Sequence, residues 1–202
     1  QGLDHEEYLG HTHEEIAETK AKIVDEESTV VTGWPIKYHN LIPKCRSLIP
    51  AEEINDWVGC TLKLMKLKCP IDLVQVPGRQ EISGDFTLDT AHNTQAINFL
   101  MSKENNYQKI LIGILKDKNL MRMVSSLPKT CEILACNLDT ERGASSSELS
   151  KICQKLGYLC RQFTTVRDAM EYATGSKTLV TGSFYTVSAA REVLNLKGHD
   201  EL

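Results

Sequence analysis

The 202-residue sequence lacks the patterns that mark several large classes of protein. Its longest apolar runs are far too short to cross a bilayer, and it has no long run of basic residues. The 23 Lys and Arg are outnumbered by 27 Asp and Glu, which gives a formal net charge of −4. We therefore expect neither a membrane-spanning protein nor one that binds nucleic acid.

Patterns for metal and phosphate sites are missing as well. None of the seven cysteines belongs to a C-x-x-C pair, so a structural zinc site is not expected. None of the twelve glycines precedes a lysine, so the P-loop pattern G-x-x-x-x-G-K-[ST] is absent. No signal peptide is recognised, and we interpret the HDEL at residues 199–202 as a coincidental match to a retrieval signal. These features predict a cytoplasmic protein with reduced, packed thiols.

The composition is that of a folded chain, with 41% hydrophobic and 25% charged residues. A helix is predicted over residues 10–24, where Thr12 and Glu15 have the spacing of a capping box. A strand is predicted over 28–32 and a helix near 51–66. Because prolines punctuate the segment that follows, we predict a first domain over residues 1–48, a linker region with one helix over 49–76 and a second domain over 77–202.

From Pro77 onward, strand-like and helix-like runs alternate. The predicted strands are 80–88, 109–115, 131–136, 159–163 and 177–181, and the predicted helices are 94–103, 117–126, 145–156, 165–173 and 184–195. This alternation predicts an α/β fold with a mainly parallel sheet covered by helices. In such sheets ligands bind at the carboxyl ends of the strands.

Lys20 is the most informative residue of the first domain. If residues 10–24 form one helix, Lys20 has Ile16, Ala17, Ile23 and Val24 as its neighbours, all of them apolar. We therefore predict a buried lysine. One interpretation is a lysine whose ammonium reaches water along the surface; the other is a lysine with a lowered pKa or a covalent change that removes its positive charge.

Polar residues gather at the predicted strand ends of the second domain. Asp89, His92 and Asn93 follow the first strand, and Ser183 follows the last. The parallel topology places these groups at one edge, together with the segment 113–118. Arg79 precedes the first strand, where its guanidinium suits a phosphate. Each residue also has an ordinary interpretation, as a helix cap or a surface turn residue.

The order of the motifs is more specific than any one of them. It runs GLDH (2–5), LGHT (9–12), IAETKA (16–21), PGR (77–79), DTAHN (89–93), GILKDK (113–118) and TGSFYTV (181–187). In this order the motifs resemble the folylpolyglutamate synthase and dihydrofolate synthase family of the Mur ligase superfamily. The resemblance covers most of the chain except roughly residues 35–75. It implies the tail of a central ATPase domain followed by a Rossmann-like domain.

The resemblance also implies roles for the first domain's residues. His5 resembles a histidine that binds Mg²⁺, and Lys20 resembles a catalytic lysine carried as its carbamate. We therefore expect Lys20 to be buried and close to His5. The sequence departs from the family pattern at Lys22, where the family has glycine.

In the second domain, Arg79 and Asp89 resemble residues that meet the phosphates and ribose of ATP. His92, the second expected catalytic residue, and Ser183 resemble residues around the incoming glutamate. We expect Asp89, His92 and Ser183 to cluster at the carboxyl edge of one sheet, with Arg79 facing the domain junction. Thr94 stands where the family has proline.

The implied function is ATP-dependent ligation of L-glutamate to dihydropteroate or to the γ-glutamyl tail of a folate, with Mg²⁺ as cofactor. Because the P-loop is missing, we expect a fragment that is inactive by itself. We also expect a monomer. A Mur-type peptidoglycan ligase and a non-catalytic nucleotide- or glutamate-binding remnant are the alternatives.

Overall fold

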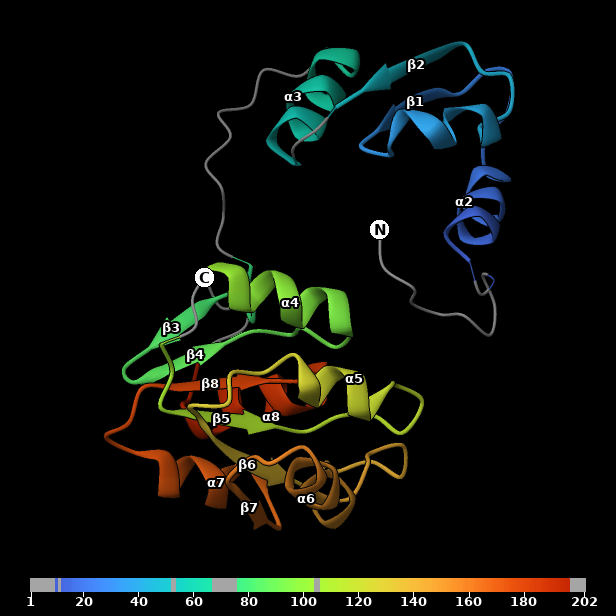
Figure 1. Ribbon diagram of the computed structural model, residues 1–202. Coiled ribbons are helices and arrows are strands. Elements are labelled where there is room, and N and C mark those ends of the chain that lie inside the picture. The colour runs from blue at the N-terminus through green and yellow to red at the C-terminus, as the bar shows by residue number, and fades with distance from the viewer. Residues whose placement is uncertain (1–9, 11, 52–53, 67–75, 104–105, 197–202) are drawn as a thin grey trace. The chain divides into compact units, whose positions relative to one another are not determined.

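The computed structural model describes residues 10, 12–51, 54–66, 76–103 and 106–196. The chain forms two compact units, Gln1–Leu73 and Val74–Leu202, and each is described by itself (Figure 1). Within the described residues, no helix is both long and apolar enough to cross a membrane.

The first unit is built around two short parallel strands, β1 (Thr29–Thr32) and β2 (Ser47–Pro50). The helix α2 (His13–Ala21) begins with the predicted capping box, in which Thr12 and Glu15 each bond the other's backbone N–H. The 3₁₀ helix η1 (Ile36–Leu41) packs against α2, and α3 (Ile54–Leu64) packs against β1. The helix predicted for the linker region therefore packs within the first unit.

The second unit contains a six-stranded sheet with the order β3-β4-β8-β5-β6-β7. Every neighbouring pair is parallel except β3 and β4. The predicted α/β fold with a mainly parallel sheet is therefore confirmed. The strands are β3 (Glu81–Ser83), β4 (Phe86–Leu88), β5 (Lys109–Ile112), β6 (Glu132–Cys136), β7 (Cys160–Phe163) and β8 (Thr178–Thr181). The helices are α4 (Thr94–Lys103), α5 (Leu120–Ser125), α6 (Ser146–Lys155), α7 (Val166–Ala173) and α8 (Phe184–Val193).

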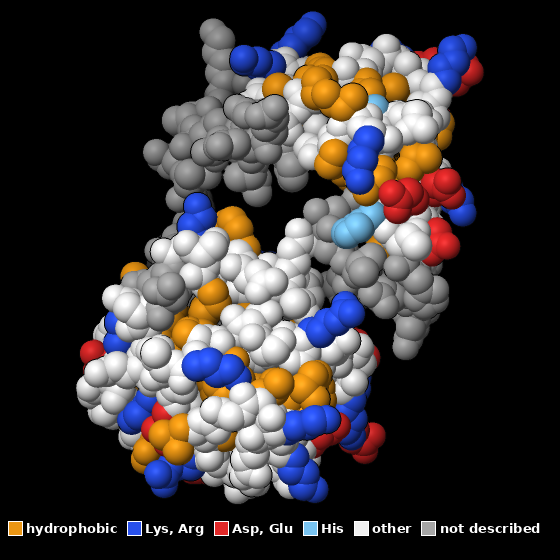
Figure 2. Space-filling view, in the orientation of Figure 1, with side chains coloured by type: hydrophobic (Ala, Val, Ile, Leu, Met, Phe, Trp, Pro, Cys, Tyr) orange, Lys and Arg blue, Asp and Glu red, His pale blue; other side chains and the backbone are white. Residues whose placement is uncertain are grey.

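Helices cover both faces of this sheet, and the strand residues alternate between two apolar cores. In β5, Ile110 and Ile112 pack with α4, α5 and α6, whereas Leu111 packs with α7 and α8. Both faces of the central strands are therefore buried, which explains why these strands read as continuous apolar runs. On the face seen in Figure 2, Lys and Arg lie among Asp and Glu over this unit, as the near balance of the two signs implies.

Three local predictions differ from the structure. The run 80–88 is two antiparallel strands rather than one, because Gly84 adopts a positive φ of 56° and turns the chain. The helix expected over 10–24 ends at Ala21, and β2 and η1 were not predicted. The N-terminal helix ends early because Asp25 and Ser28 bond the local backbone, which favours a turn over another helical residue.

The early end of α2 explains why the prediction of a buried Lys20 is wrong. Ile23 and Val24 do not continue the helix, and Ile23 is 87% exposed. The buried side of α2 is formed by Ile16, Ala17 and Ala21, and Lys20 is exposed. His5 lies outside the described residues, as do His11 and the HDEL sequence, so the expected contact between Lys20 and His5 stays a prediction.

Candidate functional site

Asp89 connects the turn before the sheet to the carboxyl edge of the sheet. It directly follows β4, and one carboxylate oxygen accepts the N–H of Gln80 at 3.0 Å while the other accepts the N–H of Ala91 at 2.9 Å. The backbone N–H of Thr90 donates to the carbonyl of Gly78 at 2.9 Å, and that of Arg79 donates to Val76 at 3.1 Å. The carboxylate therefore holds the turn that presents Arg79.

The environment of Asp89 disfavours the ionised form of its carboxyl group. The side chain is buried, and this desolvation raises the pKa of the carboxyl group above its ordinary value. The hydrogen bonds from Gln80 and Ala91 and the charge of Arg79 favour the ionised form and offset only part of this effect. Two backbone N–H donors therefore hold the buried carboxylate of Asp89 at the edge of the sheet.

Arg79 and His92 both lie close to one exposed aromatic ring. Phe184 begins α8 and is 57% exposed. The guanidinium carbon of Arg79 lies 5.9 Å from the centroid of this ring, and the His92 ring lies 5.4 Å from it at an interplanar angle of 38°. His92 Nδ1 is 2.9 Å from the carbonyl oxygen of Thr90, which fixes the orientation of the imidazole. A cation, an imidazole and an exposed ring are thus combined at one position.

Ser183 lies at the same edge but uses its hydroxyl within the fold. It is the N-cap of α8, and its Oγ accepts the N–H of Thr186 at 3.1 Å. The Thr186 hydroxyl is 2.7 Å from Ser183 Oγ and donates to the carbonyl of Gly113 at 2.8 Å. Both hydroxyls are buried. The capping interpretation of Ser183 is therefore correct, and the hydroxyl fixes the first turn of α8, which carries Phe184.

Close backbone contacts hold the ends of β5 and β8 together. Gly182 has a φ of 104°, and a Cβ atom built on it would lie 2.7 Å from the carbonyl oxygen of Gly113. The N–H of Gly182 donates to the carbonyl of Ala91 at 3.0 Å, which connects β8 to the segment after β4. Only glycine fits position 182 without displacing its neighbours.

The strand pairing determines whether the predicted site residues lie at the same edge of the sheet. Because β4 and β8 are parallel, with Leu88 paired to Val180, Asp89, His92 and Ser183 all lie at the carboxyl edge, as predicted. Their roles toward a ligand remain predictions. Phe184 and Thr186 were missed, although the Ser-x-x-Thr spacing in TGSFYTV could have revealed the cap partner.

The described residues do not provide a metal site. No group of three or more His, Cys, Asp or Glu side chains in these parts of the chain could hold a metal ion. Lys20 is exposed, and the remaining expected ligand, His5, lies outside them. The role of His5 as the expected Mg²⁺ ligand therefore stays a prediction.

Known proteins resemble parts of this chain. No family model matches the chain. A dihydrofolate synthase/folylpolyglutamate synthase of Buchnera aphidicola is 30% identical over 116 residues, which cover 53% of this chain and 27% of that protein. The chain is thus similar in sequence to a folylpolyglutamate and dihydrofolate synthase. The resemblance predicted from the motif order is thereby confirmed.

Solved structures of this group share the fold. E. coli FolC in complex with DHPP and ADP matches with a TM-score of 0.77 and 21% identity, over 96% of this chain and 59% of that one. The bifunctional synthase of Yersinia pestis complexed with AMPPNP and Mn ion matches with a TM-score of 0.75 and 21% identity, over 96% and 60%. The chain thus spans about a quarter of the curated relative and about three fifths of these solved chains.

Proposed function

We propose that this chain supplies the nucleotide- and glutamate-facing edge of an ATP-dependent ligase that adds L-glutamate to dihydropteroate or to the γ-glutamyl tail of a folate. In this reaction a carboxylate of the acceptor takes the γ-phosphoryl group of ATP, giving an acyl phosphate and ADP. The amine of glutamate then attacks the acyl carbon, and an amide and inorganic phosphate result. The relatives' names and the ADP and AMPPNP in the similar structures support this reaction class.

The observation that carries the proposal is the convergence of Arg79, His92 and Phe184 at the carboxyl edge. In this proposal the Arg79 guanidinium meets phosphate oxygens, for which its planar fork is suited. His92, whose Nδ1 faces the Thr90 carbonyl, turns its other ring nitrogen toward the reactants. Phosphoryl transfer depends mainly on positioning and on charge stabilisation, and these groups provide a part of each.

Asp89 and Ser183 take positioning roles in this proposal. Asp89 holds the 78–80 turn through Gln80, and so fixes the backbone position of Arg79. Ser183 caps α8 and so fixes Phe184. This refines the roles that the resemblance implies, because both side chains are buried and bonded to backbone groups. Lone pairs on the carboxylate of Asp89 are still available for a ribose hydroxyl.

Mg²⁺ is part of the proposed activity only through the resemblance and through the Mn ion of the similar Yersinia pestis structure, and we derive no step through it. A divalent ion would neutralise phosphate charge when bound. The P-loop is likewise missing from the sequence, so the chain by itself provides few of the phosphate contacts that the reaction needs. We therefore expect no measurable ligation from these 202 residues alone.

The alternative is a nucleotide- or glutamate-binding protein without catalysis. The missing P-loop favours it, whereas the retained order of motifs favours the ligase. The genomic reading frame upstream of Gln1 discriminates between them, because a P-loop encoded there supports the ligase and a start codon with a short leader supports the binding protein.

The direct test measures ADP release with Mg·ATP, L-glutamate and either dihydropteroate or tetrahydrofolate. The 202-residue chain should be inactive, and the same chain extended by an upstream P-loop segment should turn over. In the extended protein, Arg79→Ala and His92→Ala should lower kcat/KM by at least tenfold, whereas Arg142→Ala, at an exposed arginine, should leave it unchanged. Turnover by the 202-residue chain, or an active extended protein that tolerates both substitutions, would refute the proposal.

A further inference from the structure

An ion pair joins the edge strand β3 to the last helix of the second unit. Glu81 begins β3, Arg191 lies in the last turn of α8, and the Arg191 guanidinium donates to both carboxylate oxygens of Glu81. The Glu81 and Arg191 side chains are only 19% and 15% exposed, so salt screens this pair less than an exposed one. Neither residue belongs to a motif that resembles the ligase family. The proposed function therefore leaves this mostly buried pair without a role.

The same carboxylate also holds the turn that presents Arg79. Oε2 of Glu81 accepts the N–H of Gly78 at 2.8 Å, and Asp89 accepts the N–H of Gln80 at 3.0 Å. One carboxylate thus binds the residue before Arg79, and the other binds the residue after it. Gly78 and Gln80 both have a positive φ, 68° and 48°, which is strained for Gln80 because it carries a Cβ. The two carboxylates therefore hold the chain in a conformation that it would not adopt by itself.

One face of α8 contacts this turn at three successive levels of the helix. Spacings of three and four residues place the side chains concerned on one side of α8. They are Phe184, Val187 and Arg191. The first lies near Arg79, with its ring centroid 5.9 Å from the guanidinium carbon. The second leaves no room for a side chain at Gly78, where a Cβ would lie 2.9 Å from Val187 Cγ1. The third binds Glu81, so the ion pair completes the contact at the C-terminal end of the helix.

We propose that Glu81 and Arg191 are positioning residues that keep the Arg79 guanidinium available for the phosphates of a nucleotide. This inference rests on the proposed function, because the pair acts through Arg79. Glu81 stands two residues after Arg79, and a carboxylate attracts a guanidinium as a phosphate does. Arg191 occupies both carboxylate oxygens of Glu81. The Glu81 carboxylate can therefore hold Gly78 without capturing Arg79.

This role differs from that of a purely structural ion pair in one measurable way. Without the charge of Arg191, Glu81 becomes a mostly buried carboxylate that lacks its cation, which is unfavourable. Arg79 belongs to the same turn, so we expect Glu81 to bind it and to compete with phosphate. Glu81→Gln removes this competing charge and retains an oxygen that can accept the N–H of Gly78. Glu81→Gln should therefore rescue a variant in which Arg191 is replaced.

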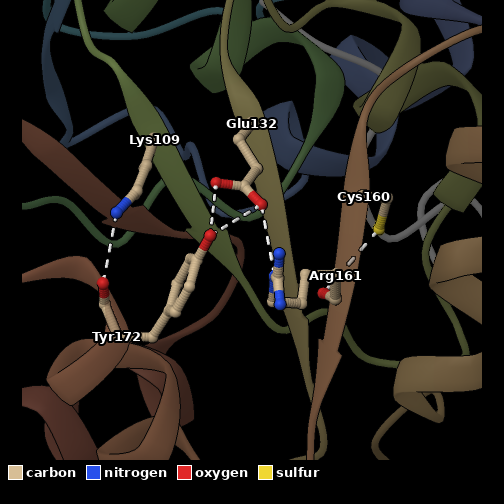
Figure 3. Close-up of polar contacts among 5 residues, drawn as sticks. All are labelled: Lys109, Glu132, Cys160, Arg161 and Tyr172. Atoms are coloured by element: carbon tan, nitrogen blue, oxygen red, sulfur yellow. Dashed lines mark hydrogen bonds and ion pairs between the residues drawn. The ribbon is translucent and has the colours of Figure 1, made fainter.

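A second ion pair of the same sheet provides a matched control. Glu132, the first residue of β6, accepts Nε of Arg161 at 3.4 Å and the hydroxyl of Tyr172 at 3.2 Å (Figure 3). The Glu132 side chain is 14% exposed, much like that of Glu81. This pair lies at the amino ends of β6 and β7, whereas Asp89 lies at the carboxyl edge. Arg161→Met thus removes the same charge from a similar carboxylate without touching the turn.

The first test detects the competition in the 202-residue chain. Two-dimensional ¹⁵N–¹H NMR measures how fast the guanidinium N–H groups exchange with water, and Arg79→Ala assigns the Arg79 signal. In Arg191→Met, the exchange at Arg79 should slow about threefold or more, because a carboxylate then accepts these groups. Arg161→Met and the double variant Arg191→Met/Glu81→Gln should exchange as the parent does. An Arg79 signal that Arg191→Met leaves unchanged would overturn the proposal.

The second test measures nucleotide binding by calorimetric titration of Mg·ADP into the P-loop-extended protein. Arg191→Met should raise the Kd about fivefold or more, because Arg79 is then bound to Glu81. Arg191→Lys retains a cation for Glu81 and should stay within about twofold of the parent, as should Arg161→Met and the double variant. Glu81→Ala should also raise the Kd, since it leaves the Gly78 N–H without its acceptor, whereas Glu81→Gln should not. Far-UV circular dichroism verifies that each variant is folded, and the two Glu81 variants test the role of the pair if Arg191→Met does not fold.

The double variant decides between positioning and packing. A loss of affinity in Arg191→Met that Glu81→Gln reverses supports the proposal. An equal loss in Arg191→Met and in the double variant overturns it, because the loss then comes from the packing of α8. Parental affinity in Arg191→Met, in a protein whose Arg79→Ala variant binds Mg·ADP more weakly, overturns this inference and leaves the proposed function standing. Parental affinity in Arg79→Ala overturns the nucleotide role of Arg79 and this inference together.

Discussion

The clearest consequence of the structure concerns Asp89→Ala. This substitution removes a buried carboxylate that accepts the N–H groups of Gln80 and Ala91 at 3.0 and 2.9 Å. A buried donor that loses its partner costs about 1–3 kcal/mol. Ala91 is buried, so its N–H has no water to replace Asp89, whereas Gln80 is exposed and water can bond its N–H. We therefore expect a loss of about 2–3 kcal/mol in the free energy of unfolding, most of it from Ala91.

The matched variant Asp89→Asn separates charge from shape. Its amide oxygen can accept the N–H of Ala91, but its NH₂ group then faces the N–H of Gln80, a second donor. We expect a loss of about 1 kcal/mol at pH 7, because one hydrogen bond is retained and the cost of burying a charge is removed. The assay is urea unfolding of the 202-residue chain followed by far-UV circular dichroism, with m-values compared between variants. Since both tryptophans, Trp34 and Trp57, belong to the first unit, their fluorescence does not report on Asp89 directly.

The raised pKa of Asp89 also predicts the direction in which stability changes with pH. Because burial raises the pKa of Asp89, the folded protein binds this proton more tightly than the unfolded chain does. The stability advantage of the parent over Asp89→Asn should therefore decrease as the pH rises from about 4, the unfolded value, through the raised folded value, and stay constant above it. An advantage that grows over this range would show that the hydrogen bonds, and not burial, dominate the pKa of Asp89. An Asp89→Ala variant within about 0.5 kcal/mol of the parent would refute the role of Asp89 in holding the turn.

Three further predictions concern the same unit. Gly182→Ala should cost at least about 2 kcal/mol in urea unfolding, because its φ is positive and its Cβ would approach the Gly113 carbonyl, whereas Gly157→Ala, with a positive φ and open space, should cost only about 1 kcal/mol. Thr186→Val should cost about 1–2 kcal/mol by the same measurement, because it leaves the buried Gly113 carbonyl without its hydroxyl donor; an unchanged midpoint would show that this bond contributes nothing. Cys136 should resist alkylation in the folded protein at pH 8, because burial raises its pKa to about 12, and modification at the rate of Cys45 would contradict this.

The sheet could be predicted because its local signals agree with its tertiary environment. The strands β5, β6 and β8 are buried on both faces, so they appear in the sequence as short apolar runs between turns. The range predicted for α4 equals the observed Thr94–Lys103. The edge that holds Asp89 and Ser183 followed from topology alone, since parallel strands bring their carboxyl ends together.

Where prediction failed, a local contact decided the structure. A buried Lys20 required residues 23 and 24 to stay helical, and the hydrogen bonds between Asp25 and Ser28 favour a turn instead. The break at Gly84 could have been recognised from its turn-forming S-G-D sequence.

Arg79→Ala provides the contrast that separates positioning from ligand contact at the proposed site. Arg79 is exposed, and its described side-chain contact is the 5.9 Å approach to the Phe184 ring, so its removal should change the free energy of unfolding by no more than about 0.5 kcal/mol. If the proposed function holds, the same substitution should weaken Mg·ADP binding by the P-loop-extended protein about tenfold or more, since a charged hydrogen bond to phosphate contributes about 1.5–3 kcal/mol. Calorimetric titration measures this loss, and Lys151→Ala, at an exposed lysine of α6, is the control. Asp89→Ala should weaken both stability and binding, because it releases the turn that carries the guanidinium. A stable Arg79→Ala protein with unchanged ADP affinity would remove Arg79 from the nucleotide site.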